Sequence, residues 1–119
     1  MWVNAHALTL AIYRATVGFP PEERYGLTWQ LRRAAASVPT NLAEGCGRYG
    51  DRELARFIAI AAGSASEVEY LLMLARDLDL LEAEVYGELH GGVTEIKQML
   101  TAFYRKLTAC MYRGGGSPF

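Results

Sequence analysis

The stretch that decides the fold is RYGLTWQLRRAAASVPTNLAEGCGR, residues 24–48. Apolar side chains recur in it every three or four positions, the spacing of one face of an α-helix: Leu27, Leu31, Ala34, Val38 and Leu42. A second face at the same spacing carries polar groups: Gln30, Arg33, Ser37, Asn41, Glu44 and Arg48. The pattern therefore predicts one amphipathic helix from Arg24 to Arg48 with an organised polar face.

A proline lies inside this predicted helix. Pro39 has no amide hydrogen for the carbonyl of Ala35, and its ring crowds that carbonyl, which costs about 3 kcal/mol in a helix interior. Because residues 40–44 continue the helical phasing, we expect a kink and not a stop. The kink would re-aim the half of the helix that carries Asn41 and Arg48.

The remainder of the chain repeats the helical pattern. Residues 3–17 form a short amphipathic segment that ends at the breaker Gly18-Phe19-Pro20-Pro21. Apolar stripes follow over residues 54–78 and 85–107, and Gly91-Gly92 predicts a bend or break in the last helix. We expect an all-α protein: an antiparallel up-and-down four-helix bundle over residues 1–113, with long second and third helices and a flexible tail at 114–119.

Composition predicts a single cytoplasmic domain. The chain has 119 residues, 51% of them hydrophobic, which suffices for one core. No run approaches the roughly 20 uncharged apolar residues of a membrane span, and the N-terminus lacks a basic leader. We therefore expect a cytoplasmic protein that makes no contact with a membrane.

Charges are segregated along the chain. Residues 24–56 hold six arginines against three acidic residues, whereas residues 67–88 hold seven acidic residues against one arginine. A basic excess returns after His90. Such segregation steers an anionic partner to one region or lets copies of the protein dock on one another, and ordinary solvated helix faces are the alternative.

No catalytic or metal-binding motif accompanies these helices. The two cysteines and two histidines lie at no metal-ligand spacing, and no phosphate-binding glycine loop or paired nucleophile occurs. Glu44 with Glu67 or Glu69 would form a carboxylate pair between facing helices, yet the Glu-x-x-His repeats of di-iron bundles are missing. We therefore expect no enzymatic activity, no cofactor and no metal.

Four motifs together resemble a known family. They are ERYGL at Glu23–Leu27, QLRRAA at Gln30–Ala35, the segment Ser37–Arg48, and IAAGSASE at Ile60–Glu67. The combination is similar to the four-helix-bundle proteins encoded in intervening sequences of bacterial large-subunit ribosomal RNA genes, over nearly the whole chain. The resemblance implies an antiparallel bundle that assembles into rings of five, so a homopentamer is expected.

A related bundle extends the expectation to partners. The accessory variability protein of diversity-generating retroelements resembles this family and is a basic pentamer that binds nucleic acid and a reverse transcriptase. The resemblance therefore implies RNA or DNA, and a reverse transcriptase, as partners. The acidic balance of the present chain departs from that basic relative.

Two sets of site residues follow. The first is expected to contact the phosphates and bases of a structured nucleic acid: Arg32, Arg48, Tyr49, Arg52 and Arg56. The second lies in the family motif and is assigned to assembly or hairpin architecture: Gln30, Arg33, Ser37, Pro39, Asn41 and Glu44. The alternative function is a scaffold ring for a protein partner, which exposure of these aromatic residues would favour: Trp2, Tyr25, Trp29 and Tyr104.

Overall fold

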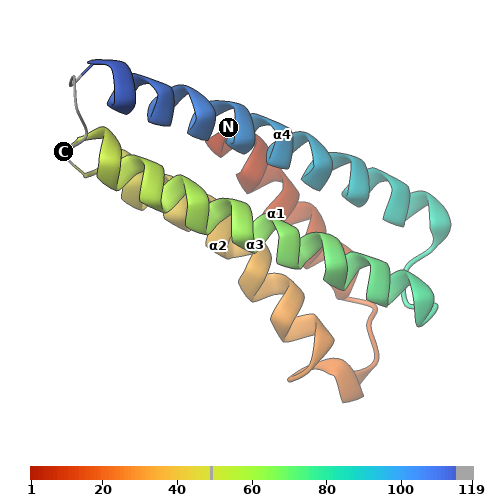
Figure 1. Cartoon of the computed structure of the whole chain (residues 1–119). Helices are drawn as coiled ribbons and strands as arrows, with labels where there is room; N and C mark the ends of the chain where they lie inside the picture. The colour runs from red at the N-terminus through yellow and green to blue at the C-terminus, as the bar shows by residue number, and fades with distance from the viewer. Residues whose placement is uncertain (49, 115–119) are drawn as a thin grey trace.

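The computed structural model describes residues 1–48 and 50–114, and it contains four α-helices (Figure 1). Their bounds are α1 Trp2–Thr16, α2 Leu27–Cys46, α3 Asp51–Asp77 and α4 Ala83–Gly114, with a short 3-10 helix η1 at Pro21–Glu23. Consecutive helices run antiparallel, and α4 also packs against α1, in a bundle of 54 × 22 × 22 Å. The predicted all-α, up-and-down four-helix bundle is confirmed.

The apolar stripes of the sequence form the core of the bundle. Every member of the stripe predicted in residues 24–48 is buried, from Leu27 to Leu42. All four helices contribute fully buried side chains, the largest of which are Ile12, Leu31, Ile58, Leu72, Ile96 and Leu100. Within the described residues α1 packs against α2 and α4 but not α3, so α1 and α3 lie on opposite sides of the core.

The second helix begins later than predicted, at Leu27 and not at Arg24. The amide of Leu27 donates to Glu23 Oε1 at 3.1 Å, which satisfies one of the free amides at the helix start. A β-carbon on Gly26 would lie 3.0 Å from that same carboxylate oxygen, so glycine leaves room for the cap. The ERYGL sequence is therefore a capping turn, and Arg24 and Tyr25 precede the helix.

Pro39 lies within α2 without ending it, as predicted. Figure 1 shows the axis of α2 changing direction between its first and second halves. The Ala35 carbonyl, which Pro39 deprives of its helical donor, accepts a hydrogen bond from Thr9 Oγ1 of α1 at 3.1 Å. The same hydroxyl lies 2.8 Å from the Ala5 carbonyl, so its one hydrogen is shared between the two carbonyls. Because an unpartnered buried polar group costs about 1–3 kcal/mol, Thr9 offsets the effect of the proline where α1 meets α2.

Replacement of Thr9 by valine removes this donor and nearly keeps the side-chain shape. We expect the free energy of unfolding to fall by about 1–2 kcal/mol. The loss should be much smaller in a chain that also carries Pro39→Ala, since alanine restores an amide donor to Ala35. Chemical denaturation of the wild type, the two single variants and the double variant measures this coupling. Equal losses in both backgrounds would show that Thr9 and Pro39 act independently.

The predicted bend or break at Gly91-Gly92 is wrong as an interruption, because α4 continues through both glycines. A β-carbon on Gly92 would approach Leu8 Cδ1 of α1 at 3.3 Å, which is a tight contact. Close packing of α4 on α1 therefore compensates for the low helix propensity of glycine. With 32 residues, α4 is longer than α2 and α3, which have 20 and 27.

Among the described residues, α3 is the one helix long and apolar enough, by length and composition, to cross a membrane. Core helices of bundles meet the same criterion. In this structure α3 packs along α2 on one side and α4 on the other.

Candidate nucleic-acid interface

Antiparallel packing brings part of the first basic segment, residues 48–56, and the C-terminal part of the last helix to one end of the bundle. Three exposed arginines lie in the α2–α3 turn and in the first two turns of α3, and the C-terminal part of α4 lies at the same end (Figure 1). We define the basic end by these five side chains: Arg48, Arg52, Arg56, Arg105 and Lys106. The opposite end, around the α3–α4 turn, carries exposed carboxylates: Asp77, Asp79, Glu82, Glu84 and Glu88. The cations of the basic end and these carboxylates are thus separated along the long axis of the molecule, and Arg76 pairs with Asp77 at the acidic end.

Two arginines of the basic end pack against the ring of Phe57. The guanidinium carbons of Arg48 and Arg56 lie 5.3 and 4.5 Å from its centroid. Arg48 pairs with Glu44 at 3.0 Å, and Arg56 pairs with Glu53 at 3.1 Å. The hydrogen bond from Arg56 lowers the pKa of the Glu53 carboxyl and raises the pKa of Arg56 itself. These contacts orient two guanidinium groups that keep further N–H donors for an anionic group.

Arg52 differs from Arg48 and Arg56 in having no carboxylate partner among the described residues. It is exposed, and it forms no ion pair within the part of the chain that the structure describes. Arg105 and Lys106 likewise form no ion pair among the described residues, and cations without a carboxylate partner are the members of the basic end that gain most from a phosphate. Tyr49, predicted to stack on a base beside it, lies outside the described residues.

Arg32 is not part of the basic end. It lies about 24 Å from Arg48 along α2, at 1.5 Å per residue. Its Nε donates to Thr16 Oγ1 at 2.8 Å, its Nη2 donates to the Tyr13 carbonyl at 3.2 Å, and it stacks 4.8 Å from the Tyr13 ring. The last carbonyls of a helix lack helical donors, so Arg32 caps α1. The structure therefore brings together Arg48, Arg52 and Arg56 but not Arg32.

The residues assigned to hairpin architecture include a polar contact between α2 and α3. Ser37 Oγ lies 2.8 Å from Ser64 Oγ of α3, and Asn41 Nδ2 donates to the Ser37 carbonyl at 2.8 Å. Arg33 reaches Glu67 of α3 at 3.4 Å. These side chains join the two helices of the hairpin along one line.

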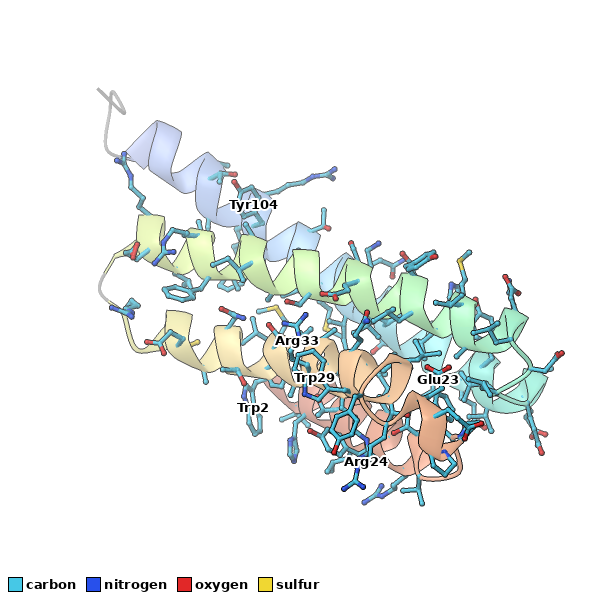
Figure 2. All side chains as sticks on the ribbon, turned by 90° about the horizontal axis from the view of Figure 1, so that it is seen from below. Trp2, Glu23, Arg24, Trp29, Arg33 and Tyr104 are labelled. Carbon is cyan, nitrogen blue, oxygen red and sulfur yellow. The ribbon has the colours of Figure 1, made fainter. Side chains whose placement is uncertain are left out.

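The other members of that set have different surroundings. Gln30 is exposed, Glu44 pairs within α2, and Pro39 is buried where α2 meets α1. Arg33 also stacks on the Trp29 ring at 5.2 Å, beside which it lies in Figure 2. The set is thus divided between the α3 side of α2 and the surface.

The carboxylate pair that an acid–base or metal site would need is not assembled in the described residues. Glu44 pairs with Arg48, Glu67 with Arg33, and Glu69 with Lys97 at 2.8 Å. Each carboxylate therefore faces a cation, and none faces another carboxylate.

The sequence interpretation missed the structural importance of Gly45. Gly45 is buried, and a β-carbon there would lie 2.9 Å from Phe57 Cβ and 3.1 Å from Leu54 Cδ1. The missing side chain lets α2 approach α3 just before the turn, which brings Arg48 against Phe57. A signal was present, because Gly45 continues the phase of the buried stripe after Val38 and Leu42.

The chain is thus a four-helix bundle with polar contacts between α2 and α3 and with a basic end. The chain belongs to the 23S rRNA-intervening sequence protein family, whose model matches residues 1–102. The resemblance inferred from the sequence motifs is therefore confirmed.

The fold is similar to that of a solved structure. This is the crystal structure of a protein with unknown function from the S23 ribosomal protein family of Bacteroides thetaiotaomicron VPI-5482. The TM-score is 0.78 at 21% sequence identity, and the match covers 87% of this chain and 96% of the other. A search of curated proteins finds no match.

Proposed function

We propose that this protein binds structured RNA or DNA in the cytoplasm, without catalysing a reaction, and that the basic end makes the contact. The observation that supports this proposal is the gathering of five exposed cations from the α2–α3 turn, α3 and α4 at one end. Three carboxylates lie in the same region, Glu44, Asp51 and Glu53, so the cations are in excess. A cationic surface of this kind contacts phosphates irrespective of base sequence.

The family name indicates the setting in which this binding would act. The family is named after the intervening sequence of 23S rRNA. We propose that the chain acts there as an accessory factor of the intervening sequence. The analogy with retroelement accessory proteins adds a reverse transcriptase as a second proposed partner.

Assembly of several copies would multiply the modest charge of one basic end. α1 and the residue that caps its C-terminal end expose three aliphatic side chains at a spacing of seven: Val3 at 73%, Leu10 at 39% and Val17 at 76%. We name these three residues the α1 stripe. Apolar residues that recur every seven positions are typical of a helix that packs on another helix. We propose that copies associate through the α1 stripe, as the ring of five that the family resemblance implies.

A salt series with a fluorescently labelled structured RNA tests the phosphate contacts. The logarithm of the binding constant should fall linearly with the logarithm of the salt concentration, with a slope of about −0.9 per phosphate contact on a duplex. Arg52→Ala combined with Arg56→Ala should weaken binding at least about tenfold at low salt and reduce the slope by about 2. A wild-type slope near zero would remove the proposal.

Arg32→Ala is the control, because it deletes an arginine of α2 that lies outside the basic end. Since Arg32 caps α1, this variant should lose about 1–2 kcal/mol of unfolding free energy and keep both affinity and slope. If Arg32→Ala weakened binding while the double variant did not, the interface would lie on the α1–α2 side and not at the basic end.

A scaffold for a protein partner is the second candidate, and the exposed aromatics favour it. The exposed fractions are 46% for Trp2, 84% for Tyr25, 53% for Trp29 and 39% for Tyr104. Figure 2 shows where Trp2, Trp29 and Tyr104 lie on the bundle. Tryptophan and tyrosine are enriched in protein interfaces. Failure of RNA and DNA to bind even at low salt, with assembly intact, would favour this scaffold.

A further inference from the structure

We propose that the groove between α1 and the C-terminal half of α2 binds an unpaired guanine base of an RNA or DNA strand. The inference rests on the proposed function, because the phosphates on either side of that base would lie on the basic end. It adds a base preference, which phosphate contacts alone do not supply.

The groove has a volume of about 590 Å³, within the range of small-molecule sites. α1 contributes one wall, with Trp2, His6 and Thr9. α2 contributes Glu44 and a floor of mostly small residues. The residues of the floor are Ala36, Pro39, Thr40, Ala43 and Gly47. An aromatic wall and a smooth floor are suited to a flat ring, whereas the open side leaves room for a strand to enter.

Trp2 is an aromatic platform that is already oriented. Its ring stacks on His6 with 5.0 Å between centroids and 10° between planes, and 46% of the residue remains exposed. Figure 2 shows Trp2 projecting beside the C-terminal half of α2. A base that stacks on Trp2 would extend an existing stack of two rings, and such stacking accepts any base.

The carboxylate of Glu44 distinguishes among bases by the hydrogen bonds that it can accept. Arg48 holds its Oε2 at 3.0 Å, and no described residue donates a hydrogen bond to its Oε1. Guanine carries two adjacent donors, N1–H and the 2-amino group, which match the two oxygens of a carboxylate. Adenine and cytosine place one amino donor beside a ring nitrogen that accepts, and that nitrogen would repel a carboxylate. Uracil and thymine offer a carboxylate one N–H donor between two carbonyl groups. The chemistry of the groove therefore favours guanine, which offers two adjacent donors.

The position of the groove fits a strand that continues to the basic end. Glu44 and Gly47 line the groove at the end where α2 finishes, and Arg48 follows directly in the chain. Arg52 lies in the first turn of α3, just after the α2–α3 turn. A base in the groove would thus direct its phosphates toward the free guanidinium group of Arg52. A second copy of the chain is the competing occupant, and the charged Glu44–Arg48 pair at the rim disfavours it.

Trp2 itself can report the binding. The chain has two tryptophans, so Trp29→Phe leaves Trp2 as the single tryptophan of the full-length protein. We expect the single-stranded RNA 5′-UUGUU to quench its fluorescence, and the inosine version, which lacks the 2-amino group, to require about tenfold more RNA. UUUUU should bind to the basic end and should quench Trp2 only at higher RNA concentrations, because its bases can stack but lack the two adjacent donors of guanine. Equal quenching by all three RNAs would overturn the inference.

Two substitutions of matched charge locate the effect. Glu44→Gln should abolish the difference between guanine and inosine, since the carboxylamide presents a donor where guanine also presents one. Glu53→Gln makes the same change at the same end, outside the groove, and should keep the difference. Circular dichroism of both variants should match that of the wild type, which checks that they are folded. If Glu53→Gln had the same effect as Glu44→Gln, general electrostatics would explain the preference and the groove would not.

Fluorescence anisotropy of labelled RNAs separates this inference from the proposed function. Binding of all three RNAs without a preference for guanine removes only the groove. Loss of binding of all three at low salt removes the proposed function as well. Acrylamide quenching of Trp2 in the free protein should be strong at every protein concentration. Protection of Trp2 that grows as copies assemble would show that a second copy fills the groove, which would also overturn the inference.

Discussion

Replacement of Gly45 by alanine is expected to lower the free energy of unfolding by about 1–3 kcal/mol, and leucine should lower it more. The added β-carbon would lie 2.9 Å from Phe57 Cβ and 3.1 Å from Leu54 Cδ1. Phe57 Cβ is attached directly to the α3 backbone, so rotation of a side chain does not relieve the contact. The helices would have to separate, which would open the core beside the turn.

Gly63→Ala is the matched control for this prediction. Gly63 lies in the middle of α3, and no atom beyond its own helix and chain neighbours comes within 4 Å of the position of its β-carbon. Alanine there should raise the free energy of unfolding by about 0.4–1 kcal/mol, because it restricts the unfolded chain. Thermal denaturation followed by circular dichroism should move the two midpoints in opposite directions. A Gly45→Ala protein as stable as the wild type would contradict the close approach of α2 and α3.

Leu10→Glu is expected to convert the assembled protein into monomers of 13.1 kDa. Leu10 is the central residue of the α1 stripe, and an interface there would enclose the new carboxylate without a cation to pair it. Multi-angle light scattering measures the mass directly. The helical content should not change, since residue 10 already faces solvent in the single chain.

Leu78→Glu controls for the general effect of a charge on an exposed leucine. Leu78 is 52% exposed at the C-terminal end of α3, away from the α1 stripe. This variant should remain assembled. A wild-type protein of monomeric mass would contradict the proposed association altogether. Assembly that survives Leu10→Glu and is lost with Leu78→Glu would place the interface at the α3–α4 turn.

The periodicity of residues 24–48 predicted the buried face of α2 correctly because helical geometry fixes which side chains share a face. The residue at which α2 begins and the continuity of α4 were harder to predict. The cap formed by Glu23 depends on the shape of the turn that precedes Leu27. The intact helix at Gly91-Gly92 depends on packing against Leu8, more than eighty positions away in the sequence. Local propensity contains neither effect.

In the candidate interface, too, some features follow from the local sequence and others depend on tertiary packing. Arg48, Arg52 and Arg56 flank one turn, so their proximity follows from the sequence order alone. The role of Arg32 follows from the position of the last turn of α1 beside α2, which no pattern in residues 24–48 encodes. The groove that contains Trp2 and Glu44 likewise depends on the register of α1 along α2.

The separation of cations and carboxylates makes the bundle an electric dipole along its 54 Å axis. In the field of a polyanion such a molecule turns before it makes contact, so that its cationic pole arrives first. Orientation at a distance raises the rate of productive encounters, and added salt shortens the range over which it acts. A long bundle of nearly neutral net charge would thereby approach nucleic acid with its basic end first.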